Sequence, residues 1–156
     1  MTRSTASGFT LIELVVALVI AGLFFALGGP SVRSLYDTMQ YREAVRELVS
    51  AAKNGRRDAF VSGMPIDLLI DTDTNHFMLT ANPTGISDDQ FVALPAALEI
   101  TVTYAAEVSP RPGLAAIRFY PAGGSSGGEI WVARPSGAGV HLTIDWLLGD
   151  VAQELL

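Results

Sequence analysis

The chain has 156 residues and contains no cysteine. It therefore has no disulfide framework, no cysteine-bound zinc site and no thiol nucleophile. Any folded domain must be held together by an ordinary apolar core. The absence of cysteine does not identify a cellular compartment.

Basic residues are scarce in the second part of the chain. Residues 63–156 carry three arginines and eleven acidic residues, a net charge of −8, and no basic residue follows Arg134. Residues 30–62 carry six basic and four acidic residues, a net charge of +2. An acidic domain of this kind repels a phosphate backbone, so we expect no nucleic acid partner.

Polar residues are almost absent between Phe9 and Gly29, where only Thr10 and Glu13 interrupt an apolar run. As a helix this run is about 31 Å long, which is the thickness of the hydrocarbon core of a bilayer. We therefore predict a transmembrane helix over residues 9–29, preceded by a polar leader, residues 1–8. Arg3 and the terminal amine favour a cytoplasmic N-terminus, with the rest of the chain exported.

Three interpretations of this segment are open. A cleaved secretory signal is one, because residues 26–28 resemble a small-x-small cleavage site, and an uncleaved signal anchor is another. Neither accounts for Glu13, whose carboxylate costs up to about 3 kcal/mol at mid-membrane and needs a partner. In the third interpretation a cut between Gly8 and Phe9 creates an amino group on Phe9. That group can pair with Glu13 of a neighbouring copy, which favours self-association.

The residues around this cut read Gly8-Phe9-Thr10-Leu11-Ile12-Glu13-Leu14-Val15. They resemble the prepilin processing motif of type IV pilins and type II secretion pseudopilins. In that family a membrane-embedded prepilin peptidase cuts after the glycine and methylates the new N-terminal phenylalanine. The resemblance implies that Gly8 is the cleavage residue, Phe9 the methylated terminus and Glu13 the carboxylate used in assembly.

Pro30 follows the apolar run. A proline within a helix removes a backbone hydrogen bond and kinks the helix, and pilin-like subunits carry a proline at this point. We predict a kink at Pro30, although Gly28-Gly29-Pro30 is also a signal for the end of the membrane helix. Residues 30–62 continue with apolar side chains at helical spacing and predict the periplasmic, amphipathic half of the helix.

Residues 63–156 have the alternating pattern and turn residues of a β-rich domain. Residues 66–70 and 76–80 are predicted to form one hairpin, and residues 115–120 and 129–133 a second one. Further strands are predicted at residues 98–104, at residues 140–146 and, as a short strand, within residues 147–156. The fold class is α+β and pilin-like, with the long N-terminal helix packed on an antiparallel, two-layer sheet. Residues 41–68, 117–132 and 142–151 resemble the H-type (FimT-like) minor pseudopilins, whereas residues 72–115 add little to this resemblance.

Some residues resemble chemical motifs. Asp71, Asp73 and Asn75 have the residue types and spacing that begin a calcium-binding loop, but His76 replaces the expected glycine. A hairpin turn is therefore the preferred interpretation, and ion binding stays open. The glycine-rich segment 123–128 lacks the Lys-Ser/Thr of a phosphate loop. His76 and His141 have no companions at metal-ligand spacing. We expect no catalytic residues, no metal and no cofactor.

The resemblance implies a minor pseudopilin near the tip of a periplasmic pseudopilus that drives type II secretion. It implies a single-pass protein of the bacterial inner membrane, with its C-terminal domain in the periplasm. Its partners would be other major and minor pseudopilins, the prepilin peptidase, the inner-membrane assembly platform and membrane lipid. A minor pilin of a type IV pilus is the alternative, although the acidic segment 145–156 disfavours a role in DNA uptake. An anchored envelope enzyme is a third hypothesis.

Overall fold

The structure is a computed structural model that describes residues 9–156, apart from the side chains of residues 25–35 and 88. It divides into two compact units, a helical one that ends at Met39 and a second one, Gln40–Leu156. Helix α1 (Leu11–Ser62) contributes its first part to one unit and its last part to the other.

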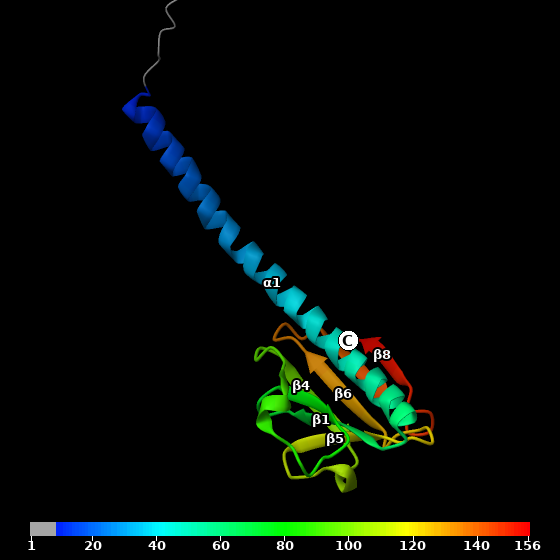
Figure 1. Cartoon of the computed structure of the whole chain (residues 1–156). Helices are drawn as coiled ribbons and strands as arrows, with labels where there is room; N and C mark the ends of the chain where they lie inside the picture. Colours follow the sequence, from blue (N-terminus) through cyan, green and yellow to red (C-terminus); the bar gives the residue numbers. More distant parts are fainter. Residues whose placement is uncertain (1–8) are drawn as a thin grey trace, which may run out of the picture. The chain divides into compact units, whose positions relative to one another are not determined.

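The second unit consists of the last part of α1 and two four-stranded antiparallel sheets (Figure 1). Sheet A has the order β3-β2-β1-β5, with β1 (Ile66–Asp71), β2 (His76–Thr80), β3 (Val92–Ala93) and β5 (Leu114–Phe119). Sheet B has the order β4-β6-β7-β8, with β4 (Glu99–Tyr104), β6 (Gly128–Ala133), β7 (Gly139–Ile144) and β8 (Val151–Leu155). Two short 3₁₀ helices, η1 (Asp88–Gln90) and η2 (Ala106–Val108), lie in the connections. This architecture confirms the predicted α+β class.

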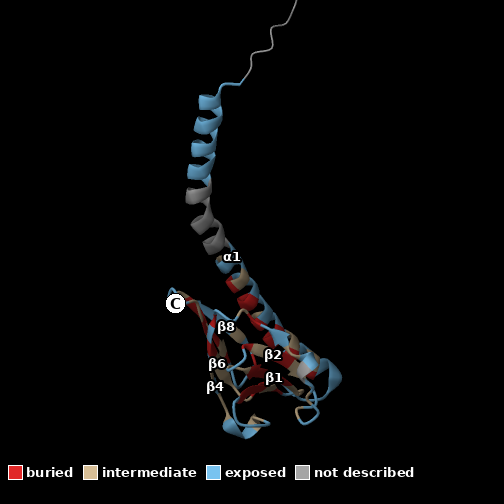
Figure 2. Cartoon of the chain, turned by 90° about the vertical axis from the view of Figure 1, so that its left-hand side faces the viewer, coloured by how far each residue is buried: buried red, intermediate tan, exposed pale blue. Residues whose placement is uncertain are grey.

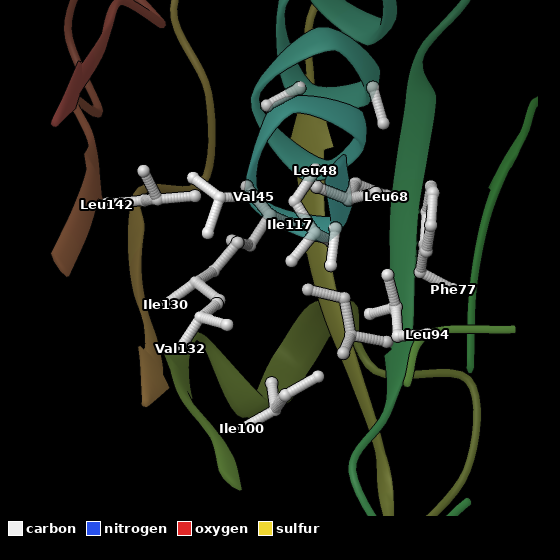
Figure 3. Packing of buried hydrophobic residues seen from close by; sticks show 14 of the residues in the cluster. Val45, Leu48, Leu68, Phe77, Leu94, Ile100, Ile117, Ile130, Val132 and Leu142 are labelled. Atoms are coloured by element: carbon white, nitrogen blue, oxygen red, sulfur yellow. The ribbon is translucent and has the colours of Figure 1, made fainter. Parts of the chain in front are cut away.

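The last part of α1 supplies the side chains that fill the space between the two sheets. In Figure 3, Val45 and Leu48 of the helix lie between Leu142 of sheet B and Leu68 of sheet A. Figure 2 shows the same arrangement as a buried face on this part of α1, turned towards the buried strands. Every residue of this main core cluster comes from Tyr41 or later, so the second unit contains its own complete core.

The strand predictions are right in position but wrong in one pairing. Strands β1 and β2 form the predicted hairpin. In contrast, β5 and β6 are not a hairpin, because β5 pairs with β1 in sheet A and β6 pairs with β4 in sheet B. The glycine-rich segment between them carries the chain from one sheet to the other. Among the described residues, a single isolated β-bridge forms here, between Phe119 and Ser125.

Gly55 sets how closely α1 approaches sheet A. A Cβ atom on Gly55 would lie 2.9 Å from Cδ2 of Phe119 and 3.0 Å from Cδ2 of Leu79. Phe119 is fully buried, so a shift of its ring would disturb the close-packed core around it. This close approach explains a glycine at a helix interior position, where glycine otherwise costs about 0.5–1 kcal/mol relative to alanine.

We expect the substitution Gly55→Val to lower the free energy of unfolding by about 1–3 kcal/mol, because the added methyl groups overpack the core. Urea denaturation followed by circular dichroism measures the effect. Ser50→Ala, on the exposed face of the same helix, is the control and is expected to change stability by less than about 0.5 kcal/mol. A Gly55→Val loss no larger than that of the control would contradict the proposed packing.

Candidate assembly site

The first turn of α1 is built by Thr10 and Glu13. The backbone N–H of Thr10 donates to Oε2 of Glu13 at 3.1 Å, and the N–H of Glu13 donates to Oγ1 of Thr10 at 3.3 Å. The Thr10 hydroxyl also donates to Oε2 of Glu13, at 3.2 Å. This reciprocal pattern is a capping box, which satisfies backbone donors that have no partner in the helix. Glu13 therefore has a local structural role as well as its predicted role in assembly.

The described part of α1 before residue 25 exposes its apolar side chains around the whole helix (Figure 2). These exposed side chains are Leu11, Ile12, Leu14, Val15, Val16, Leu18, Val19, Ile20, Leu23 and Phe24. Phe9, just before the helix, is also exposed. An apolar surface of this extent favours contact with lipid or with other apolar helices. Within the described residues, no helix meets the length and hydropathy required to cross a membrane.

The predicted site residues are described to different extents. Gly8 and the rest of the leader, residues 1–8, lie outside the described residues. Phe9 and Glu13 are four residues apart at the start of α1, where both side chains are accessible to a partner. The helix assignment continues across Pro30, but the side chains of residues 25–35 are outside the description, so the kink stays a prediction.

The segment that resembles a calcium loop is a hairpin turn between β1 and β2. Oδ1 of Asp71 accepts hydrogen bonds from the backbone N–H groups of Asp73 at 3.0 Å and Thr74 at 3.1 Å. Asn75 has a φ of 54°, and its side chain donates to the carbonyl oxygen of Leu98 at 2.8 Å. In the part of the chain that the structure describes, no group of three or more His, Cys, Asp or Glu residues is placed to hold a metal.

The glycine-rich segment between β5 and β6 also has a structural role. The hydroxyl of Ser125, which is buried, donates to the carbonyl oxygen of Asp145 at 2.9 Å and accepts from the N–H of Gly127 at 2.9 Å. Gly124 packs against the backbone of residues 146 and 147, where a Cβ atom would lie 2.8 Å from the carbonyl oxygen of Trp146. These contacts fix the turn between β7 and β8 rather than form a phosphate loop.

Comparison with known proteins supports the N-terminal motif and the fold together. Residues 3–28 match the family model of the prokaryotic N-terminal methylation motif. Type II secretion system protein H of Xanthomonas campestris is 28% identical over 151 residues, which cover 97% of this chain and 85% of that protein. This chain therefore carries the N-terminal methylation motif and is similar to an H-type secretion protein along nearly its whole length.

Solved structures of H-type pseudopilins have the same fold. The minor pseudopilin EpsH of Vibrio cholerae superposes with a TM-score of 0.54 at 12% identity, over 75% of this chain and 96% of that one. The solution structure of GspH of Escherichia coli gives a TM-score of 0.51 at 14% identity, over 75% of this chain and 89% of that one. The predicted pilin-like fold is therefore confirmed, and the sequence similarity supports the predicted H-type resemblance.

Sequence reasoning missed two structural features of this chain. The capping box was visible as Thr10-x-x-Glu13, the spacing typical of this motif, but Glu13 was interpreted only as a charge in need of a partner. The ion pair between Asp67 and Arg118 gave no signal, because the two residues are 51 positions apart and meet only across paired strands.

Proposed function

We propose that this chain is a minor pseudopilin that acts near the tip of the pseudopilus of a type II secretion system. Residues 9–29 anchor it once in the bacterial inner membrane, and residues 30–156 lie in the periplasm. The observation that carries the proposal is the similarity to a type II secretion system protein H along nearly the whole chain.

The N-terminal motif supports processing by a prepilin peptidase. In this proposal the enzyme cuts between Gly8 and Phe9 and methylates the new amino group of Phe9. The family match over residues 3–28 includes both positions. After the cut, the charged amine of Phe9 lies close to the start of α1 and is free to approach the carboxylate of another subunit.

The exposed apolar side chains of residues 11–24 supply the affinity between subunits. Lipid tails are as apolar as these side chains, so close packing and polar contacts decide which helices associate in a membrane. The pairing of Glu13 with the Phe9 amine of a neighbour is such a polar contact, because it neutralises two charges that are costly in a bilayer. The partners are other major and minor pseudopilins, delivered by the inner-membrane assembly platform.

The proposed role is structural rather than catalytic. The polar residues that resembled a site have structural partners in the described chain, such as the turn donors at Asp71 and the backbone contacts of Ser125. The pseudopilin acts by its place in the filament, where addition of subunits at the membrane moves the tip outwards.

Export from a deletion strain tests this function. In the host bacterium we expect deletion of the gene to trap normally exported enzymes in the periplasm, and a plasmid copy to restore export. The readout is enzyme activity in the culture medium and in the periplasmic fraction. Normal export combined with loss of surface pili or twitching would instead identify a minor pilin of a type IV pilus and overturn the proposal.

A further inference from the structure

Strand β8 is the last strand of sheet B and pairs with β7 on one side only (Figure 1). The N–H of Asp145 donates to the carbonyl oxygen of Asp150 at 2.9 Å. At the other end of the strand pair, the N–H of Leu156 donates to the carbonyl oxygen of Gly139, also at 2.9 Å. In an antiparallel pair, residues that exchange hydrogen bonds alternate with residues that do not. The direction of every backbone group of β8 therefore follows from these two contacts.

Three residues of β8 turn their backbone groups away from the sheet. They are Val151, Gln153 and Leu155, and we call their outward N–H and C=O groups the open edge. In the described part of the chain no strand pairs with the open edge. Residues 152–155 are also exposed, so neither a helix nor a loop buries it. The open edge can therefore form hydrogen bonds with an extended segment of another molecule.

An apolar side chain beside the open edge lacks a cover. Leu155 lies opposite Val140 in the register, so it belongs to the core-facing side of sheet B. Val140 is 2% exposed, whereas Leu155 is 84% exposed. A further strand next to β8 would place side chains beside Leu155 and cover it, because neighbouring strands bring their side chains into contact.

The other edges of the two sheets offer less room for a strand. β3 is two residues long, and β4 and β5 contact each other where the two sheets meet. Natural sheets protect a free edge with proline, lysine, a bulge or a covering segment. β8 contains neither proline nor lysine, and its register with β7 continues without a bulge from Val151 to Leu155. It is therefore the edge that best accepts a further strand.

Acidic residues surround the open edge. Residues 145–156 contain three acidic residues and no lysine or arginine. Asp150 pairs with Arg56 of α1, whereas the exposed Glu154 of β8 forms no ion pair with a described residue. A second copy of this chain would add more negative charge, because residues 63–156 carry a net charge of −8. The charge therefore favours a strand with basic residues from a different protein.

We propose that a strand from the globular domain of another pseudopilin adds to β8 and extends sheet B. Its backbone pairs with the open edge, which is the contact used in recognition by strand addition. A basic side chain of the partner approaches Glu154, and an apolar one covers Leu155. The contact joins two different subunits and does not propagate, which suits a minor subunit near the tip. The inference rests on the proposed function, which supplies another pseudopilin as the partner, and it names the surface that this partner binds.

Proline substitutions separate the open edge from the side of β8 that pairs with β7. Gln153→Pro removes an outward N–H, which a strand at the edge of a sheet tolerates, whereas Ala152→Pro removes an N–H that faces β7. In spheroplasts of the host, we expect the full-length Gln153→Pro chain to resist added protease as the wild type does. Ala152→Pro is expected to be degraded several-fold faster. If Gln153→Pro is degraded as fast as Ala152→Pro, the open edge is assigned wrongly and the proposal fails.

Photo-cross-linking in the host detects the added strand. A benzophenone amino acid replaces Leu155 in the full-length chain, and light is expected to join this chain to one other pseudopilin, which mass spectrometry identifies. The product is expected to disappear when the gene of that pseudopilin is deleted. Gln153→Pro is expected to lower the yield several-fold. Gln153→Ala is the matched control, because it keeps the backbone N–H, and it is expected to retain the yield.

The other outcomes contradict strand addition. A product formed equally well by Gln153→Pro would show a contact that does not use the open edge. A dimer of this chain, or a link to an exported enzyme, would show a different occupant. No product in a strain that exports normally would show that the open edge stays free. The deletion strain tests the proposed function separately, since loss of export on deletion combined with any of these outcomes rejects strand addition alone.

Discussion

Substitution of Glu13 by leucine is expected to leave cleavage after Gly8 intact but to reduce export to the level of the deletion strain. Leucine favours the helix and removes a carboxylate that costs up to about 3 kcal/mol in the membrane, so insertion is retained. The neighbouring Phe9 amine then has no partner, and the polar contact that selects the correct helix is lost. The shift in mass after cleavage, sheared pseudopili and exported enzyme measure the three steps.

Glu13→Gln is the matched control, because Glu13 also forms the capping box with Thr10. Glutamine is accepted at this position of a capping box, so the variant keeps the start of α1 and removes only the charge. If charge pairing drives assembly, Glu13→Gln fails as Glu13→Leu does. Wild-type export by Glu13→Gln would show that the cap, and not the charge, is what assembly requires.

The helix in the second unit was predictable because its apolar residues repeat with the period of a helix. Val45, Leu48 and Ala52 follow this spacing, and all three are buried in the core. Strands β1, β2, β4 and β7 were predictable for a similar reason, since each combines β-forming residues with clear turn signals at its ends. The spacing of apolar and turn residues along the chain is therefore enough to predict these elements.

The pairing of β5 was not predictable from local pattern. A glycine-rich segment between two strands usually predicts a hairpin, but here Gly123, Gly124 and Gly127 all have positive φ, and the segment crosses between the sheets. The partner of β5 is β1, which lies far back in the sequence. Which strand it joins depends on which sheet buries its side chains, and that is a property of the whole domain.

The functional candidates also differ in how far the sequence alone reveals them. Gly8, Phe9 and Glu13 form a short contiguous motif, so sequence alone was enough to select them. In contrast, the placement of Glu99, Glu129 and Glu154 on one sheet gave no such signal, because it depends on the order of strands in sheet B. The exposure of Trp146, 68%, is likewise a property of the fold that no local pattern indicates.

The largest expected effect on stability comes from the ion pair between β1 and β5. Asp67 is 1% exposed and sits directly opposite Arg118 in the strand register. Nε and Nη2 of Arg118 donate to the two carboxylate oxygens of Asp67 at 2.7 and 2.8 Å. The hydrogen bond to Asp67 raises the pKa of Arg118, although burial opposes this shift. Such a two-pronged contact is among the stronger polar interactions in proteins.

We expect Arg118→Met to lower the free energy of unfolding by about 3–5 kcal/mol, because it leaves a buried carboxylate without its partner. Asp67→Leu is expected to cost less, since the side chain of Arg118 is 29% exposed and still reaches water. The double variant Asp67→Leu/Arg118→Met removes both charges and is expected to recover most of the loss. Urea denaturation of the unit from Gln40 onwards, which contains the complete main core, measures all three.

Arg111→Met provides the control, because Arg111 is exposed just before β5 and its loss is expected to change stability by less than about 0.5 kcal/mol. The double variant decides the interpretation. If it is as unstable as Arg118→Met, the loss does not come from an unpaired buried charge, and the pair instead contributes net attraction between β1 and β5. If it is close to the wild type, the pair is needed mainly because each charge would be costly alone. Its value then lies in fixing the register of the two strands.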